Sequence, residues 1–181
     1  MAKKGNPKKL VKFSPPKLIK LDLSYGPLPD NHPYTRMDFD PFDFPWPLKD
    51  KSVEEAFSAY LLHRVPAQSR GQWMDELYRV LVDEGKAIVI TPYWTSFRSV
   101  QDYCVEWPPV VEQSYLYFNK GFRDANKIDY PIKADFDFQY GYTLDADTQS
   151  RTDEERAFRV KFYNNSVLDL QVTLTKRKAG A

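Results

Sequence analysis

Few side chains in this sequence of 181 residues are suited to acid–base or metal chemistry. It has one cysteine, Cys104, and two histidines, His32 and His63. These numbers exclude an internal disulfide framework, a cysteine-rich zinc site and a histidine-rich metal centre, so we expect no metal. A histidine such as His63 can act as a general base near neutral pH, and its simpler alternative is a loop histidine that follows a strand.

Composition and charge indicate the broad class. Apolar residues make up 42% and charged residues 28% of the chain, as in folded proteins. No apolar run approaches the roughly 20 residues of a membrane-spanning helix, and the lysine-rich start lacks the apolar stretch of a secretory signal. We therefore expect a reduced cytoplasmic protein without a membrane segment. Residues 1–16 are predicted as a basic disordered tail and residues 17–178 as a single domain.

The basic tail has two interpretations. Six lysines and no acid lie in residues 1–17, although the whole chain carries a net charge of only +1. Such a tail can contact nucleic acid. Lysines by themselves carry little recognition chemistry, so we favour a solvated tail over a nucleic-acid contact.

The first half of the chain predicts strands and one long helix. Residues 17–23 predict a strand, and the prolines at 27, 29 and 33 forbid a regular helix after it. A short strand is expected within residues 34–40. Residues 70–82 carry one apolar stripe and predict a helix, which ends with Gly85 in a left-handed turn. Residues 86–91 predict a buried strand, and a helix leading into such a strand is typical of parallel α/β sheets.

The second half predicts antiparallel strands. Residues 135–142 alternate, with aromatic side chains on one face, and predict a half-buried strand. Residues 157–163 and 167–176 alternate as well. The three residues 164–166 (NNS) join them, which predicts an antiparallel hairpin at the C-terminal end.

Two segments resemble the class I S-adenosylmethionine-dependent methyltransferases. Residues 76–90 (ELYRVLVDEGKAIVI) resemble a stretch of that family in which a helix ending RVL-x-PGG runs into the fifth strand of the sheet. Residues 44–56 (FPWPLKDKSVEEA) resemble the family's FPWPF-x-D-x-SVDEV, which opens the fourth strand. Ser52 and Glu55 have the spacing of a helix capping box, but the resemblance favours a strand at residues 53–58.

Further motifs follow in the family's order. Residues 61–65 (LLHRV) lie where the family has VLEHV, with Leu62 in place of the acid. Residues 92–102 resemble a subgroup known mainly from phage and bacterial genomes, which reads QDPTHKR where this chain reads QDYCVEW. Val105 stands at the histidine position of that motif, so a substrate-facing role of that histidine is lost here. The likeness covers about residues 36–178.

The motif that binds the methyl donor in this family is altered. The family uses a first strand, a Gly-rich turn and a helix N-terminus. Residues 21–26 (LDLSYG) resemble its LDLGCG with Ser24 in place of the first glycine, and the prolines after Gly26 cannot supply the helix. In a second register, residues 18–23 are the second strand and Asp22 binds the ribose hydroxyls. In either register, one βαβ half-unit is absent or rebuilt.

The resemblance implies a Rossmann-like three-layer α/β sheet of methyltransferase type. The sheet is expected to be mostly parallel, with an antiparallel C-terminal hairpin and an incomplete N-terminal βαβ unit. The resemblance also implies S-adenosylmethionine as cofactor and a methyl acceptor of unknown identity. The candidate cofactor-binding residues are Asp22, Ser24, Gly26, Asp38, Phe39, Asp40 and Tyr60, and the candidate catalytic residues are His63 and Tyr93.

Some of these candidates have structural alternatives. Asp38 or Asp40 would bind the adenine amino group while Phe39 packs against the ring, or all three form turns in a proline-broken loop. Tyr93 follows the buried strand on the side where α/β sheets bind substrates. Its alternative is a packed aromatic cluster beneath the following loop.

Two functions are compatible with the resemblance. One is methyl transfer in the cytoplasm, or in the host cytoplasm for a phage protein. The other is a non-catalytic binding or scaffold protein that keeps the sheet and has lost the cofactor. A lost strand–helix unit uncovers a sheet edge or an apolar face, so the second function predicts a homodimer or a partner complex.

Overall fold

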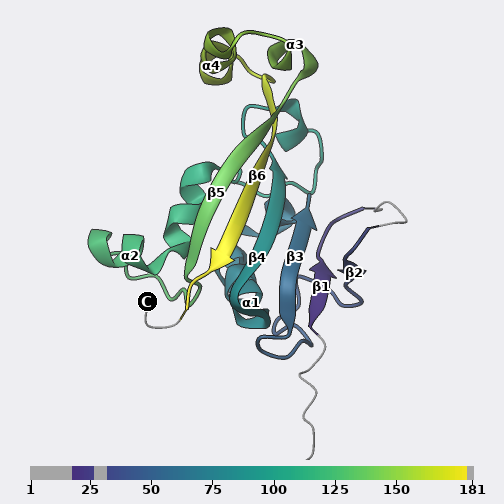
Figure 1. The fold of residues 1–181 in the computed structure, drawn as a ribbon, viewed down its shortest axis with the longest axis vertical. Helices are drawn as coiled ribbons and strands as arrows, with labels where there is room; N and C mark the ends of the chain where they lie inside the picture. Colours follow the sequence, from purple (N-terminus) through teal and green to yellow (C-terminus); the bar gives the residue numbers. More distant parts are fainter. Residues whose placement is uncertain (1–17, 27–31, 179–181) are drawn as a thin grey trace, which may run out of the picture.

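A computed structural model describes residues 18–26 and 32–178 of the chain. Their strands form one six-stranded sheet in the order β2-β1-β3-β4-β6-β5 (Figure 1). The first four strands run parallel, and β6 runs antiparallel to both β4 and β5. The predicted fold class is therefore confirmed. The strands are β1 (Ile19–Asp22), β2 (Thr35–Arg36), β3 (Val53–Ala59), β4 (Leu81–Pro92), β5 (Phe136–Leu144) and β6 (Val167–Lys176).

The pairing of β3 with β4 settles the ambiguous segment at residues 53–58. Phe57 lies opposite Ile88 in the parallel ladder, and Val53, Ala56 and Ser58 are buried. The predicted strand is confirmed and the capping box is not used. Glu55 binds other partners: it accepts hydrogen bonds from Lys20 Nζ at 2.9 Å and from the Tyr34 hydroxyl at 2.7 Å.

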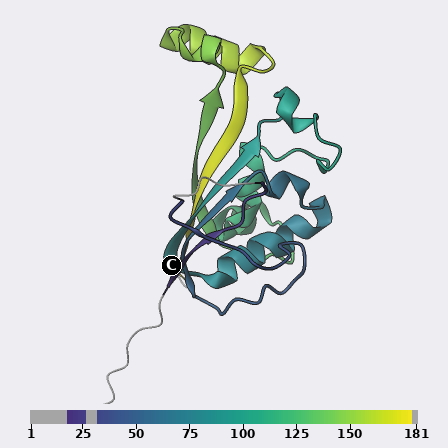
Figure 2. The same ribbon diagram turned by 90° about the vertical axis from the view of Figure 1, so that its right-hand side faces the viewer.

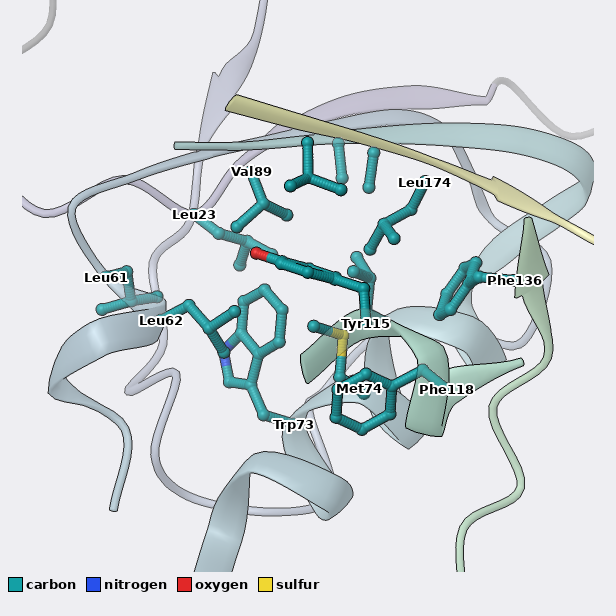
Figure 3. Packing of buried hydrophobic residues seen from close by; sticks show 14 of the residues in the cluster. Leu23, Leu61, Leu62, Trp73, Met74, Val89, Tyr115, Phe118, Phe136 and Leu174 are labelled. Atoms are coloured by element: carbon teal, nitrogen blue, oxygen red, sulfur yellow. The ribbon is translucent and has the colours of Figure 1, made fainter. Parts of the chain in front are cut away.

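Helix α1 (Arg70–Val80) confirms the predicted long helix. Its stripe of Trp73, Met74, Leu77 and Val80 is fully buried against the sheet. Figure 3 shows Trp73 and Met74 packed beside Tyr115 and Phe118, whose 3-10 segment Glu112–Phe118 covers the same face. The helices that pack on the sheet lie on one side of it among the described residues (Figure 2). The remaining helices are α2 (Lys120–Asn126), α3 (Ala146–Gln149) and α4 (Asp153–Phe162).

The expected role of Gly85 is wrong in detail. The left-handed residue of this turn is Glu84, with φ of 63°, and β4 already begins at Leu81. Gly85 is needed for a different reason. A Cβ atom there would lie 2.8 Å from the Val82 carbonyl oxygen and 3.1 Å from the Glu54 carbonyl oxygen. The absent side chain lets β4 approach β3 closely.

The predicted hairpin between residues 157–163 and 167–176 is wrong. Residues 153–162 form helix α4, and β6 pairs with β5. Local chemistry favours the helix, because Thr152 and Glu155 form a reciprocal capping box and Asp153, Glu154 and Glu155 place negative charge at the helix N-terminus. The C-terminal hairpin is thus β5–β6, with α3 and α4 in its connection.

The N-terminal unit is shortened. In doubly wound sheets of order 3-2-1-4-5, the first strand lies beside the fourth. Here β1 lies beside β3, the strand that resembles the family's fourth, so β1 occupies the first-strand position. The described residues between β1 and β3 contain only the two-residue strand β2 and no helix. The predicted basic tail lies outside the described residues. None of the helices within the described part meets the length and hydropathy that a membrane crossing requires.

We predict that Gly85→Ala destabilises the protein. The new methyl group meets two backbone carbonyls that cannot move without distorting the β3–β4 ladder, and such overpacking costs about 1–3 kcal/mol. Thermal unfolding followed by circular dichroism should show a melting temperature several degrees lower, at roughly 2–4 °C per kcal/mol. Gly141→Ala is the matched control, because no atom lies within 4 Å of the position that a Cβ would take there. Equal melting temperatures for the two variants would contradict the close approach.

Candidate functional site

The candidate residues gather at one edge of the sheet. Parallel strands end at the same edge, and in α/β sheets ligands bind outside the carboxyl ends of the strands. Every predicted site residue is in the last position of a parallel strand or in the segment that follows one. These residues are Asp22, Ser24 and Gly26 after β1, Asp38, Phe39 and Asp40 after β2, Tyr60 and His63 after β3, and Tyr93 after β4.

Two of the candidates at the end of β1 are engaged within the protein. Asp22 is fully buried, and its carboxylate accepts from the Ser24 amide at 2.8 Å and pairs with Arg36 Nη1 at 3.2 Å. The Ser24 hydroxyl accepts a hydrogen bond from the Ala59 amide at 2.9 Å. These contacts tie β1 to β2 and β3. Both carboxylate oxygens of Asp22 therefore have partners in the protein itself.

Gly26 differs from these two residues. Its φ of +98° is a conformation that side chains disfavour, and no atom of the described residues lies within 4 Å of the position a Cβ would take. Its carbonyl accepts from Arg36 Nη1 at 2.7 Å, which holds this residue beside β2. No side chain of the described residues therefore covers the backbone at this position.

The three candidates after β2 have different surroundings. Phe39 packs on Trp46, with ring centroids 5.7 Å apart, as part of the core boundary. The Asp40 carboxylate accepts from the Phe42 amide at 2.8 Å and forms a turn. Asp38 is exposed, and its carboxylate has no hydrogen bond or ion pair with the described residues. Asp38 follows Met37, whose amide donates to the Asp22 carbonyl at 3.0 Å, so it projects from the end of the β1–β2 pair.

A cleft of about 320 Å³ lies at the ends of β3 and β4. Tyr60 has a left-handed backbone, with φ of 56°, and its amide donates to the Ile90 carbonyl at 2.9 Å, which turns the chain away from the sheet. Burial, and after it the carboxylate of Asp169, raise the pKa of Tyr60. The cleft brings together residues from three segments: Tyr60, His63, Arg64, Pro92, Arg98, Gln101 and Asp102.

His63 lies in the wall of this cleft. It is 5% exposed, and its Nδ1 atom has no partner in the described part of the protein. Burial, together with the neighbouring guanidinium of Arg64, lowers the pKa of His63 to about 4. The imidazole is therefore uncharged at neutral pH and offers a lone pair.

Arg64 connects the turn after β1 with the segment after β4. Its guanidinium lies 3.8 Å from the centre of the Tyr25 ring, and it forms an ion pair with Asp102. A cation over an aromatic face is attracted by the ring quadrupole. The turn after β1 is thereby held against the segment that follows β4.

Tyr93 is 8% exposed and contacts Tyr142, with ring centroids 5.2 Å apart. Burial raises the pKa of Tyr93. Its neighbour Trp94 is 53% exposed at the same strand end. The structure therefore places Tyr93 in an aromatic cluster beneath the edge and Trp94 on the surface.

Sequence reasoning missed Asp169 and Arg98. Asp169 lies on β6 opposite Pro92 of β4, is 3% exposed, and pairs with Arg98 Nη1 at 2.7 Å. The sequence did offer one signal for Asp169, which is a single acid among the apolar residues of a strand. A carboxylate is almost never buried without a partner, so this pattern indicates a buried ion pair. The partner could not be identified from the sequence, since Arg98 is 71 residues away.

Comparison with known proteins shows the fold. No protein-family model and no curated protein matches the sequence. A solved S-adenosylmethionine-dependent methyltransferase from Archaeoglobus fulgidus is similar with a TM-score of 0.55 at 11% identity, over 79% of this chain and 68% of that one. Another from Mesorhizobium loti has a TM-score of 0.44 at 16% identity, over 83% and 72%. The first of these establishes that this chain has the methyltransferase fold, which confirms the resemblance at that level.

We predict that the stability of the protein depends on the protonation of His63. Its folded-state pKa of about 4 is below the ordinary 6.5, so the unfolded state binds a proton first as the pH falls. The contribution of the neutral His63 to the free energy of unfolding is fully present above about pH 6.5 and is lost between about pH 6.5 and 4. The loss amounts to at most about 3 kcal/mol. Urea unfolding at several pH values should show a steeper loss across this window for the wild type than for His63→Gln. Parallel curves would contradict a buried neutral imidazole.

Proposed function

We propose that this protein transfers a methyl group from S-adenosylmethionine to an acceptor that enters the cleft at the ends of β3 and β4. The observation that carries the proposal is the presence of two groups at the carboxyl edge of a methyltransferase-type sheet: Gly26, whose backbone is not covered by any described side chain, and Asp38, whose carboxylate has no partner among the described residues. The acceptor-side cleft begins on the neighbouring strand of the same edge.

The residues at this edge fit the donor in two respects. The space beside Gly26 admits a ligand against the main chain, as the glycine of a nucleotide-binding turn does. The Asp38 carboxylate can accept hydrogen bonds from ribose hydroxyls or from the adenine amino group. Both oxygens of the buried Asp22 carboxylate, by contrast, already accept from the Ser24 amide and Arg36. When bound, S-adenosylmethionine supplies an activated methyl group. We therefore assign the donor contacts to Gly26 and Asp38.

The cleft residues are suited to positioning an acceptor. Methyl transfer depends mainly on the alignment of donor and acceptor, so few acid or base groups are needed. Tyr60 and Arg98 offer hydrogen-bond donors in the cleft. His63 offers an uncharged imidazole, which can accept a hydrogen bond from the acceptor at neutral pH.

A second candidate is a non-catalytic protein that keeps the fold and binds no donor. The observation that favours it is the engagement of Asp22 and Ser24 with neighbouring strands, together with the absence of a helix after β1 among the described residues. In this candidate the hydrogen bonds of these two residues serve only to hold the shortened unit together. Donor binding separates the two candidates.

We predict that S-adenosylmethionine and its demethylated product bind the wild-type protein and bind Asp38→Ala more weakly. Removal of a hydrogen bond to a charged group costs about 1.5–3 kcal/mol, which corresponds to roughly 10–100-fold in affinity. Isothermal titration calorimetry measures both affinities. Asp43→Ala is the matched control, because it removes an exposed carboxylate from the same loop and no side-chain bond of Asp43 is seen.

The outcomes distinguish the candidates. If both substitutions weaken binding equally, the result contradicts the role of Asp38, but it does not contradict donor binding by the wild-type protein. No heat of binding with either compound at millimolar concentration would contradict the methyltransferase and support the non-catalytic protein. Thermal unfolding gives a second readout, since a ligand at 100 times its Kd stabilises the native state by about 2.7 kcal/mol.

A further inference from the structure

Helix α4 has no buried residue, although it carries large apolar side chains. It stands with α3 at the far end of the β5–β6 hairpin, beyond the helices that cover the sheet (Figures 1 and 2). Phe158, Phe162 and Tyr163 are 55%, 61% and 52% exposed. Their rings pack on one another, with centroids 4.8 Å apart for Phe158 and Phe162. Val160 packs against the core and Arg159 binds Thr148 of α3 at 2.9 Å, but the aromatic face of α4 is left exposed.

The outward face of α4 has a distinctive order of charges. Glu154, Phe158 and Lys161 are separated by four and three residues, which places them along one stripe of the helix. Glu154 lies near the N-terminal end of the stripe and Lys161 near the C-terminal end. Neither charge forms an ion pair with any residue that the structure describes. By contrast, Arg159 on the inner side pairs with Asp147 at 2.7 Å.

We propose that α4 is the contact helix of a homodimer, in which it pairs antiparallel with α4 of a second copy of this chain. A twofold axis beside Phe158 brings the two Phe158 side chains together. The same operation places Glu154 of each copy opposite Lys161 of the other, because the two residues lie at nearly equal distances on either side of Phe158. The surface is thus complementary to itself, which is the requirement of a twofold interface.

A second pair of exposed aromatic side chains lies near the segment that follows α4. The Asn165 amide donates to the Thr95 carbonyl at 3.2 Å, and the Phe97 amide donates to the Asn165 side chain at 2.6 Å. These bonds hold Trp94 and Phe97, which are 53% and 55% exposed, next to the segment that follows α4. Five half-exposed aromatic side chains amount to a buried area on the order of 1,000 Å² over two copies, the minimum for a specific interface.

The order of the charges favours a second copy over another partner. Asp153 and Arg159 have ion-pair partners within the chain. Glu154 in the first turn and Lys161 in the last turn have none among the described residues, so an antiparallel partner with the same order of charges pairs with both. A second copy of this helix has that order. The proposal concerns the surface of α4 and does not depend on the proposed function, since neither Gly26 nor Asp38 takes part.

We predict that the full-length protein dimerises and that Phe158→Ser weakens the dimer by about 30-fold, as truncation of a central aromatic residue does. Sedimentation velocity over a range of micromolar concentrations measures the association. Phe42→Ser is the matched control, because it removes a comparably exposed ring, 41% exposed, that lies far from α4 in the sequence. The Phe158 ring is 55% exposed, and its aromatic neighbours among the described residues are Phe162 and Tyr163 at the end of α4, so circular dichroism should show an unchanged fold.

Charge exchange tests the antiparallel register. Glu154→Lys and Lys161→Glu each create like-charge pairs across the axis and should each weaken the dimer roughly tenfold. The double variant E154K/K161E exchanges the charges within each copy and should restore wild-type association. A monomeric wild type, a dimer that Phe158→Ser leaves intact, or a double variant as weak as the single variants would each overturn the proposal.

Discussion

The parallel ladder between β3 and β4 organises the whole molecule. It places Phe57 beside Ile88 and ends both strands at one edge, where Tyr60 turns the chain away through its bond to the Ile90 carbonyl. A side chain at Gly85 does not fit the ladder, because its Cβ would lie 2.8 Å from the Val82 carbonyl oxygen and 3.1 Å from the Glu54 carbonyl oxygen. All other strands add to this pair: β1 on one side, and β6 on the other. The position of the cleft follows from this ladder.

The shortened N-terminal unit is stabilised by polar contacts in place of a packed helix. The buried Asp22 carboxylate binds the Ser24 amide and Arg36, and the Ser24 hydroxyl binds the amide of Ala59 on β3. A buried carboxylate is tolerated only when its oxygens have partners, so these residues are committed to the fold. The donor contacts that we propose for this end therefore use the Gly26 backbone and the Asp38 carboxylate instead.

The far end of the β5–β6 hairpin shows the opposite situation. Its helix α4 satisfies its own backbone through the capping box of Thr152 and Glu155, yet its aromatic side chains have no apolar surface to cover within the described residues. Helix formation there is a local event, whereas burial requires another surface. The two helices thus differ in what stabilises them. Helix α4 is stabilised by its capping box, whereas α1 is stabilised by Trp73, Met74 and Leu77 in the core.

The structure places every candidate site residue in the last position of a parallel strand or after it. The strand at residues 53–58 is predicted from the resemblance to the methyltransferases, although the local capping box favours a helix. Local sequence patterns were sufficient to predict helix α1 and the buried strand at residues 86–91, since apolar periodicity expresses which face of an element is buried. They did not reveal that β6 pairs with β5, that both oxygens of the Asp22 carboxylate have partners, or that Asp169 meets Arg98 beside the cleft. These facts emerge from the three-dimensional arrangement, because most of the contacts involved join residues far apart in the chain. Their formation depends on how the strands are ordered in space, which no local pattern encodes.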